Sequence, residues 1–360
     1  MAKIERKERF GLGGCRLIWH MDRVHQWAAG ERIAPIHIDM GLTKRCNIRC
    51  QFCYGAFQKM TGEMIKEDAL LRLVDSAAQV GVKSIAFVGD GEPTLNPAMY
   101  RALIKATNKN IRVGISTSGV KIDVPGIITE HADYCRINIG SATPWGYSKI
   151  HRVHGSVQQT VVKNIEQLVR YRNTYSDRCL LLMQTVLVPD ALDELVGLAK
   201  LAVELGVDGL LVKQFSDPGS GIPSRGFDKQ AHQERRTAIL KEAEALSTER
   251  TKIFVKWNAM GWENGRPYKR CIDLPFIFQI SGNGKCYPCG YHFGNPKYCY
   301  GDIHTQSLQE ILNSDTYWRI IEDMRINFDA QTQCQGTCRH DNTNIWLHDW
   351  LDRPQHVDFI

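Results

Sequence analysis

Residues 43–55 read TKRCNIRCQFCYG, and this stretch spaces Cys46, Cys50 and Cys53 as C-x3-C-x2-C. A closed structural metal site usually has four protein ligands, so three thiolates indicate a distant fourth ligand or an open coordination position. Three thiolates can hold three irons of a [4Fe–4S] cube and leave the fourth iron open. We therefore expect these cysteines to bind an iron–sulfur cluster.

Two other interpretations of the triplet explain less of it. A redox pair formed by Cys50 and Cys53 leaves Cys46 without a role. A zinc site needs a fourth ligand, and the nearest histidines, His37 and His25, lie on the preceding strand candidate or before it.

The chain around this loop alternates short apolar runs with amphipathic helical patterns. The helical patterns at 67–81 and 192–206 both end in Gly, as helix C-termini often do. Repeated strand–helix units indicate a parallel sheet with helices outside it. We predict a mixed α/β fold with a full or partial barrel over 31–258, whose strands lie at 34–41, 84–90, 111–117, 134–140, 179–188, 209–215 and 252–258.

The composition changes after residue 258, where Gly, Pro, Asn, Tyr and Cys become frequent. Short apolar runs flank GNG at 282–284, which predicts a β-hairpin. We therefore expect a small C-terminal domain at 259–360, with residues 1–30 as an N-terminal extension.

Length and composition describe an ordinary globular protein. The 360 residues are 43% hydrophobic and 23% charged, and the net charge of +6 is spread along the chain, so nucleic-acid binding is not expected. No apolar run approaches the roughly 18 residues that span a bilayer. The charged N-terminus lacks an apolar signal core, so we expect a cytoplasmic protein without a membrane partner.

Twelve cysteines are many for a chain that is expected to stay in a reducing compartment. Cys15, Cys135 and Cys179 stand alone and are best explained as small buried hydrophobes. The remaining nine fall at 46–53 and 271–338. This grouping predicts two metal centres.

Beyond the cysteines, further segments resemble those of the radical S-adenosylmethionine (SAM) superfamily. FVGDGEPTLNP at 87–97 is similar to that family's Gly-Gly-Glu-Pro segment, which implies that Gly89 and Gly91 let the backbone approach the SAM amino group and that Glu92 helps to hold it. STSG at 116–119 resembles the family's Thr-Asn-Gly, with Ser118 in place of Asn, and this resemblance makes Thr117 a candidate for SAM binding.

The resemblance also implies where the rest of SAM lies. Ser141, which follows the fourth strand candidate, is the candidate for ribose binding, and Phe52 and Tyr54 flank Cys53, where they would pack on adenine or shield the cluster. Plain packing is an equally good explanation of these two aromatic residues. The implied chemistry is reductive cleavage of SAM at the open iron, which gives a 5′-deoxyadenosyl radical that abstracts hydrogen from a substrate. A flavodoxin- or ferredoxin-type protein is the expected electron donor.

The second cysteine group resembles the C-terminal auxiliary-cluster domains of radical SAM enzymes, in the short form called twitch. Four thiolates can bind a second [4Fe–4S] cluster completely, and Cys271, Cys289, Cys334 and Cys338 are the candidate ligands. The longer SPASM form adds a C-x2-C-x5-C run, which this sequence lacks, so one auxiliary cluster is expected. Cys286 is an alternative to Cys289, Cys299 has no assigned role, and a zinc ribbon is the alternative for the whole region.

Several polar residues on the strand candidates are expected to meet the substrate. In IHID, His37 and Asp39 share one strand face, so Asp39 could hold a substrate hydroxyl or amine. Lys213 and Lys256 could act as a base or as anion-binding groups, and exposed positions at strand ends would explain both equally well. His340 is expected to support a ligand rather than to be one.

Together these features predict a radical SAM enzyme with a partial (β/α)6 TIM-type barrel, α/β in class. We expect it to oxidise a small polar substrate, such as a sugar, aminocyclitol or nucleoside, with the auxiliary cluster as electron acceptor. Among twitch enzymes, the nearest likeness is to 2-deoxy-scyllo-inosamine dehydrogenase: the first cysteine separation and the gap to the last pair are similar, whereas the final C-x3-C departs from that enzyme's closer pair. The alternatives are a radical decarboxylase, isomerase or epimerase of a sugar or nucleoside, a peptide-modifying maturase, and a non-catalytic Fe–S or zinc protein that binds nucleic acid. The last leaves GDGEPTLNP without a function.

Overall fold

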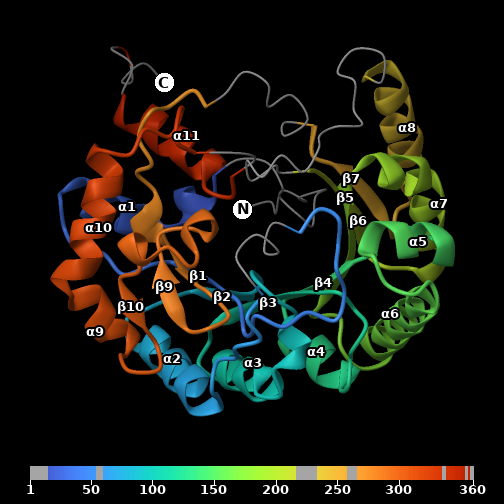
Figure 1. The fold of residues 1–360 in the computed structure, drawn as a ribbon, viewed down its shortest axis with the longest axis horizontal. Helices are drawn as coiled ribbons and strands as arrows, with labels where there is room; N and C mark the ends of the chain where they lie inside the picture. Colours follow the sequence, from blue (N-terminus) through green and yellow to red (C-terminus); the bar gives the residue numbers. More distant parts are fainter. Residues whose placement is uncertain are drawn as a thin grey trace, which may run out of the picture.

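The computed structural model describes residues 15–53, 60–215, 233–257, 266–334, 338–352 and 356. Its central feature is a sheet in which seven parallel strands follow one another in chain order (Figure 1). Every strand expected between residues 34 and 258 is present, which confirms the mixed α/β class with a parallel sheet as its core. The strands are β1 His37–Met40, β2 Ser84–Phe87, β3 Arg112–Thr117, β4 Tyr134–Asn138, β5 Leu180–Leu187, β6 Gly209–Gln214 and β7 Lys252–Val255.

Apart from the first, the helices of this region cover the outer face of the curved sheet (Figure 1). Pro125, Pro144 and Pro189 begin three of them, where a missing backbone N–H costs nothing. No helix in the described part of the chain is long and apolar enough to cross a membrane. The helices are α1 Met21–Ala28, α2 Glu67–Gln79, α3 Met99–Asn108, α4 Pro125–His131, α5 Pro144–His151, α6 Ser156–Tyr175, α7 Pro189–Leu205 and α8 Gln233–Ala245.

The two faces of the parallel strands differ in chemistry. Alternate residues such as Ile38, Cys135 and Val212 are fully buried in the main hydrophobic core that the helices share. The residues between them point to the opposite, inner face. In a closed eight-stranded barrel that interior is filled mainly by Val, Ile and Leu, whereas here it carries many polar side chains, among them His37, Asp39, Ser84, Arg136, Asn138, Gln184 and Lys213.

The C-terminal segment continues the same sheet on the far side of β1. Strand β8 Ile277–Ile280 pairs in parallel with β1, and β9 Lys285–Tyr287 returns antiparallel to β8, as the GNG turn predicted. The composition shift near residue 258 therefore does not interrupt the sheet, and the division at 258/259 stays a prediction. The remaining elements are β10 Gly301–Asp302, α9 Leu308–Asn313, α10 Asp315–Ile326 and α11 Asp341–Leu351.

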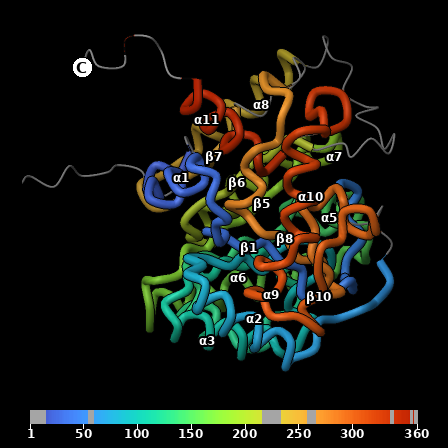
Figure 2. The backbone as a smooth tube through the Cα atoms, turned by 90° about the vertical axis from the view of Figure 1, so that its left-hand side faces the viewer, coloured from blue at the N-terminus to red at the C-terminus, as the bar shows by residue number. Residues whose placement is uncertain are grey.

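The two ends of the described chain pack on each other. Helix α1 and the 3-10 helix η1 Arg16–Trp19 share a small apolar core with α11, in which Val24 and Leu347 are fully buried. The rings of His25 and Trp350 stack with centroids 5.8 Å apart. Figure 2 shows α1 and α11 as neighbours at one end of the molecule.

Candidate cluster and substrate site

The loop after β1 brings Cys46, Cys50 and Cys53 together. Burial raises the pKa of Cys46 to about 11, with further contributions from Glu92 and Cys53, and it raises the pKa of Cys50 well above its ordinary value, with further contributions from Cys53 and Cys46. Neighbouring buried thiolates repel one another, so they need a cation to be stable. This donor set fits positively charged irons.

Backbone contacts with the end of α5 hold this loop in place. The Arg49 N–H donates to the His151 carbonyl and the Gln51 N–H to the Ile150 carbonyl, both at 2.9 Å. The Gln51 side-chain amide also donates to Asp190 at 2.9 Å, at the start of α7. The cysteine loop is thereby anchored to two helices of the barrel.

His151, which the sequence analysis did not select, contacts a predicted cluster ligand. Its Nδ1 lies 3.0 Å from Cys50 Sγ, while its Nε2 accepts a hydrogen bond from the Gly140 N–H at 2.9 Å. Burial lowers the pKa of His151 to about 3, so the ring is neutral. Because Nε2 is an acceptor, the single proton belongs on Nδ1, which faces the sulfur. The pair of histidines in HRVH at residues 151–154 was the only feature of the sequence that could have drawn attention to His151.

The GDGEP segment packs against the cysteine loop, backbone to backbone. Gly91 has a φ of +90°, and a Cβ on it would meet the Thr43 carbonyl oxygen at 1.9 Å. A Cβ on Gly89 would lie 3.1 Å from the Gly41 nitrogen. The Glu92 N–H also donates to the Arg45 carbonyl at 2.7 Å. The glycines therefore permit a close approach to the cluster loop, and their approach to SAM stays a prediction.

Glu92 links the ends of β2 and β3. Its buried carboxylate accepts hydrogen bonds from the Thr117 hydroxyl and the Ser118 N–H, both at 2.6 Å, and from the Thr94 N–H at 3.1 Å and hydroxyl at 2.8 Å. The Ser118 hydroxyl donates to the side-chain oxygen Oδ1 of Asn47 at 2.9 Å. The side-chain nitrogen Nδ2 of Asn47 is buried and has no hydrogen-bond partner among the described residues. This donor inside the C-x3-C segment fits an anionic ligand such as the SAM carboxylate.

The other predicted SAM contacts have neighbours of their own. The Ser141 hydroxyl donates to Glu194 Oε2 at 2.5 Å, which occupies its proton. Phe52 lies edge-on to His151 with ring centroids 5.9 Å apart. Tyr54 lies outside the described residues. The roles of all three toward SAM stay predictions.

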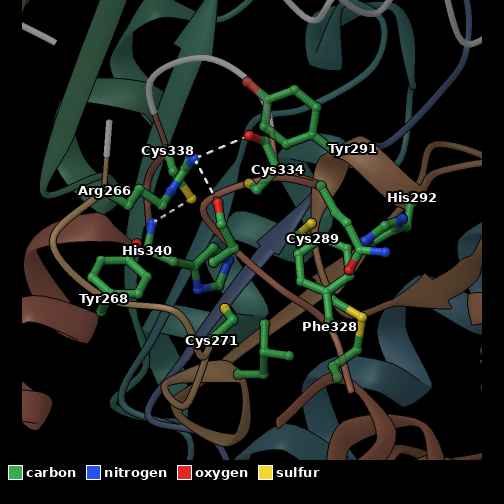
Figure 3. Close-up of a pocket in the computed structure, with 14 residues that line it drawn as sticks. Arg266, Tyr268, Cys271, Cys289, Tyr291, His292, Phe328, Cys334, Cys338 and His340 are labelled. Atoms are coloured by element: carbon green, nitrogen blue, oxygen red, sulfur yellow. Dashed lines mark hydrogen bonds between the residues drawn. The ribbon is translucent and has the colours of Figure 1, made fainter. Parts of the chain in front are cut away.

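The second cysteine group surrounds a cavity of about 240 Å³ that is lined by Cys271, Cys289, Cys334 and Cys338 (Figure 3). Burial raises the pKa of Cys289 to about 12, and the Cys334 thiol adds to this effect. The Arg266 guanidinium donates to the Cys334 carbonyl at 3.2 Å and the His340 N–H to Cys338 Sγ at 3.3 Å. The four thiols thus face a space in which a cluster could be held.

Cys286 and Cys299 lie elsewhere. Cys286 is fully buried in β9 opposite Gly301, and its pKa is raised by burial and by the nearby Cys299. Neither cysteine lines the cavity of the other four. Within the described residues, no three Cys, His, Asp or Glu side chains are gathered as the ligands of one metal ion would be.

Polar residues buried beneath the cavity support Cys271 and Cys338. His340 Nδ1 lies 3.0 Å from both carboxylate oxygens of Asp273. Burial opposes the charging of His340, but the Asp273 carboxylate outweighs it and raises the pKa of the ring. The Asn344 amide donates to Asp273 at 2.9 Å. The His340 ring is therefore held by Asp273, and its supporting role toward a cluster ligand stays a prediction.

Asp39 lies on the inner face of the sheet and contacts the C-terminal segment. Its carboxylate forms an ion pair with Arg339 at 2.7 Å and lies 3.1 Å from His37 Nε2. Burial opposes ionisation of Asp39, yet Arg339 and His37 hold its pKa below the ordinary value. Arg339 directly follows Cys338, and nothing in the sequence indicated that it would reach β1.

Lys213 and Lys256 also lie on the inner face, beside each other. The Lys256 N–H donates to the Val212 carbonyl at 3.2 Å, which places Lys256 next to Lys213 on the neighbouring strand. Burial, together with Arg136, Lys256 and Arg339, holds the pKa of Lys213 well below its ordinary value. Arg136 on β4 belongs to the same group and was missed in the sequence, where it looked like one charged residue in an apolar run.

Comparison with known families identifies both halves of this arrangement. Residues 40–202 match the model of the radical SAM superfamily, and residues 271–339 match SPASM, an iron–sulfur cluster-binding domain. The first domain implies a [4Fe–4S] cluster and SAM, and the second implies additional auxiliary iron–sulfur clusters. The expected C-terminal auxiliary-cluster domain is thus confirmed, while the number of its clusters stays a prediction.

Individual relatives match over most of the chain. A tungsten-containing aldehyde ferredoxin oxidoreductase cofactor-modifying protein of Pyrococcus furiosus is 23% identical, covering 78% of this chain and 82% of that protein. An AdoMet-dependent heme synthase of Methanosarcina barkeri is also 23% identical, covering 81% of this chain and 85% of that protein. The crystal structure of Streptococcus suis SuiB superposes with a TM-score of 0.63 at 15% identity, covering 85% of this chain and 72% of that one. SuiB has also been solved with its precursor peptide SuiA. The particular likeness to the inosamine dehydrogenase stays a prediction.

Proposed function

Because the chain carries a radical SAM superfamily domain followed by a SPASM domain, it is a radical SAM enzyme, and we propose that it oxidises a small polar substrate held on the inner face of its sheet. When bound, the first cluster and SAM supply a 5′-deoxyadenosyl radical that removes a hydrogen atom, and an auxiliary cluster supplies an acceptor for the second electron. A flavodoxin- or ferredoxin-type protein is the proposed reductant.

One contact carries the proposal that the auxiliary site takes part in the reaction. Asp39, which faces the inner side of the sheet, pairs at 2.7 Å with Arg339, the residue that follows Cys338. Asp39 also belongs to the strand that leads into the Cys46 loop. A substrate beside Asp39 would therefore lie between the two cysteine sites, as an electron transfer from one side to the other requires.

The chain's own residues divide the remaining tasks. Cys46, Cys50 and Cys53 would hold the first cluster, and Cys271, Cys289, Cys334 and Cys338 the auxiliary one. Glu92 and Asn47 would orient the amino and carboxylate groups of SAM. Asp39 would bind the substrate hydroxyl or amine and take up the proton that is lost as the carbonyl forms, and the ammonium or guanidinium groups nearby would keep it ionised until then.

Peptide modification is the second candidate. The PqqA peptide cyclase of Granulibacter bethesdensis is 31% identical over 90 residues, which cover 25% of this chain. The SuiB–SuiA complex shows that a fold of this kind can hold a peptide. Decarboxylation, isomerisation or epimerisation of a sugar or nucleoside would use the same radical without a second electron acceptor.

Iron content and SAM cleavage test the proposal. Anaerobic reconstitution should give about eight irons per chain if both sites hold cubes. With dithionite as reductant, wild-type protein should release 5′-deoxyadenosine, Cys50→Ala should release none, and Cys289→Ala should still cleave SAM. Normal cleavage by Cys50→Ala, or four irons accompanied by one zinc, would overturn the assignment of the two sites.

The reaction type needs a substrate screen. An aminocyclitol, a nucleoside, a hexose and a precursor-type peptide can each be incubated with the reconstituted enzyme and followed by mass spectrometry. Loss of two hydrogen atoms from a small substrate, in wild-type protein but not in Cys289→Ala, supports oxidation through the auxiliary site. The same product from both proteins, or turnover of the peptide alone, would contradict it.

A further inference from the structure

Three cationic side chains gather on the inner face of the parallel sheet: Arg136 on β4, Lys213 on β6 and Lys256 directly after β7. On β4 and β6 the neighbouring residues Cys135, Ile137 and Val212 are fully buried under the outer helices, so Arg136 and Lys213 point the other way, and the β6–β7 register gives Lys256 the same direction as Lys213. Lys213 and Lys256 are adjacent across the β6–β7 pair. Like charges in such positions destabilise a sheet.

The carboxylate that acts on both Arg136 and Lys213 is Asp39, and Arg339 already pairs with it. Burial lowers the pKa of Lys256, and it is likewise lowered by Arg136, Arg339 and Arg16. Among the described residues, the group therefore combines five cations with one neutralising carboxylate. We call the space that these residues line the chamber. It carries an excess of positive charge.

The hydrogen-bonding capacity of the group is also incomplete. Arg136 Nε is buried and has no hydrogen-bond partner among the described residues, although the guanidinium lies 5.7 Å from the Tyr134 ring centroid. A buried donor without a partner is unfavourable, so an acceptor that reached it would remove that cost. On the adjacent strand, Gln184 donates to Asn138 at 2.7 Å, while its own side-chain oxygen, Oε1, is buried and has no partner in the part of the chain that the structure describes.

We propose that this chamber binds the substrate through an oxyanion, a carboxylate or a phosphate, with the Arg136 fork and the ammonium groups of Lys213 and Lys256 as its ligands. Gln184 Oε1 accepts a hydrogen bond from a hydroxyl or amine of the same molecule. Guanidinium suits such an oxyanion because its planar fork can donate two parallel hydrogen bonds. From the sequence, Lys213 and Lys256 could each act as a base or as an anion-binding group. Their side-by-side position favours anion binding.

The substrate class rests on the proposed function, which it narrows from polar molecules to anionic ones. Anion binding accounts for the otherwise unfavourable position of Lys213. Burial and the neighbouring cations hold the pKa of Lys213 well below its ordinary value. An oxyanion between these cations would offset their repulsion. The reacting end of the substrate would then lie toward Asp39, at the C-terminal end of β1, from which the cysteine loop departs.

Anion binding to the reconstituted enzyme tests the proposal without any turnover. Inorganic phosphate and malonate are titrated calorimetrically at constant ionic strength, with chloride as the reference anion. We expect at least one of the two to bind, and Arg136→Gln and Lys213→Met each to weaken it about tenfold or more, the loss expected for one charge-assisted hydrogen bond. Preference for phosphate or for malonate identifies which oxyanion the chamber accepts.

Lys200→Met is the matched control, because Lys200 is exposed on α7 and its loss changes the net charge by the same amount. It should bind the anion as wild type does. Binding of neither anion above chloride, or equal binding by wild type, Arg136→Gln and Lys213→Met, would overturn the inference. Iron content and circular dichroism establish that each variant is folded. If Arg136→Gln does not fold, Lys213→Met alone is used for the test.

SAM cleavage by the same samples separates this inference from the proposed function. If dithionite-reduced protein releases 5′-deoxyadenosine while neither anion binds, the substrate class is wrong and the radical SAM assignment stands. If an anion binds and depends on Arg136 while SAM is never cleaved, the chamber is an anion site but the proposed function is wrong.

Discussion

The imidazole of His151 lies between the loop that follows β4 and a predicted cluster ligand. Its Nε2 accepts a hydrogen bond from the Gly140 N–H at 2.9 Å, and its Nδ1 lies 3.0 Å from Cys50 Sγ. The first contact fixes the tautomer, so the second is an N–H group directed at sulfur. Hydrogen bonds to cluster sulfurs are among the factors that set the reduction potential of iron–sulfur clusters. His151 is therefore placed to adjust the first cluster.

We predict that His151→Phe lowers the reduction potential of this cluster. The N–H···S bond stabilises the more negative, reduced cluster more than the oxidised one, and a difference of about 1 kcal/mol corresponds to about 40 mV for one electron. A redox titration followed by EPR measures this shift. His154→Phe is the control, since His154 is exposed and bonds to Ser156 instead. An unchanged potential in fully loaded His151→Phe would show that the contact has no such effect.

Cys289 and Cys286 should differ in their importance for the auxiliary cluster. Cys289 lines the cavity with Cys271, Cys334 and Cys338, whereas Cys286 is buried in β9. Cys289→Ser should therefore lose up to about four irons on reconstitution, and Cys286→Ser should keep them. Iron analysis and Mössbauer spectroscopy distinguish the two results. The reverse pattern would move the ligand assignment from Cys289 to Cys286.

Gly91→Ala should prevent the cysteine loop from docking. The new Cβ would meet the Thr43 carbonyl oxygen at 1.9 Å, and the residue would have to keep a φ of +90°. Gly30→Ala separates these two effects, because Gly30 has a φ of +83° with nothing within 4 Å of the added Cβ. We expect about 1–2 kcal/mol of destabilisation for Gly30→Ala, and for Gly91→Ala in addition a loss of the first cluster's iron. Full iron loading of Gly91→Ala would contradict this.

Asp90 should hold the β2 loop to the C-terminal domain. Its buried carboxylate accepts from the Ser281 hydroxyl and the Gly282 N–H, both at 2.7 Å, and lies 3.7 Å from the Lys44 ammonium. Asp90→Ala should cost about 3 kcal/mol of unfolding free energy, because it removes the acceptor from two buried donors and the carboxylate from a buried cation. Asp123→Ala, which removes an exposed pair with Lys121, should cost less than about 1 kcal/mol. Anaerobic denaturant unfolding compares them, and equal losses would argue against the link.

The sequence predicted features that depend on local pattern. Alternating apolar runs and helix-ending glycines were sufficient to locate the strands β1 to β7, because side-chain periodicity and backbone preferences act over a few residues. The spacing of Cys46, Cys50 and Cys53 likewise indicated an open cluster, since all three belong to one loop. The hairpin around 282–284 followed from turn chemistry in the same way.

Local sequence pattern could not indicate which residues far apart in the chain are in contact. Asp39 and Arg339 are 300 positions apart, and His151 follows Cys50 by 101. Their contacts exist because β8 pairs with β1 and because α5 ends beside the cysteine loop. The polar lining of the sheet, with Arg136, Lys213 and Lys256 on one face, also emerges only when parallel strands from separate strand–helix units are aligned. The sequence by itself determined the elements and the class of chemistry, whereas the tertiary structure decided which charges face the chamber, because strand pairing and packing bring together groups that are remote in the chain.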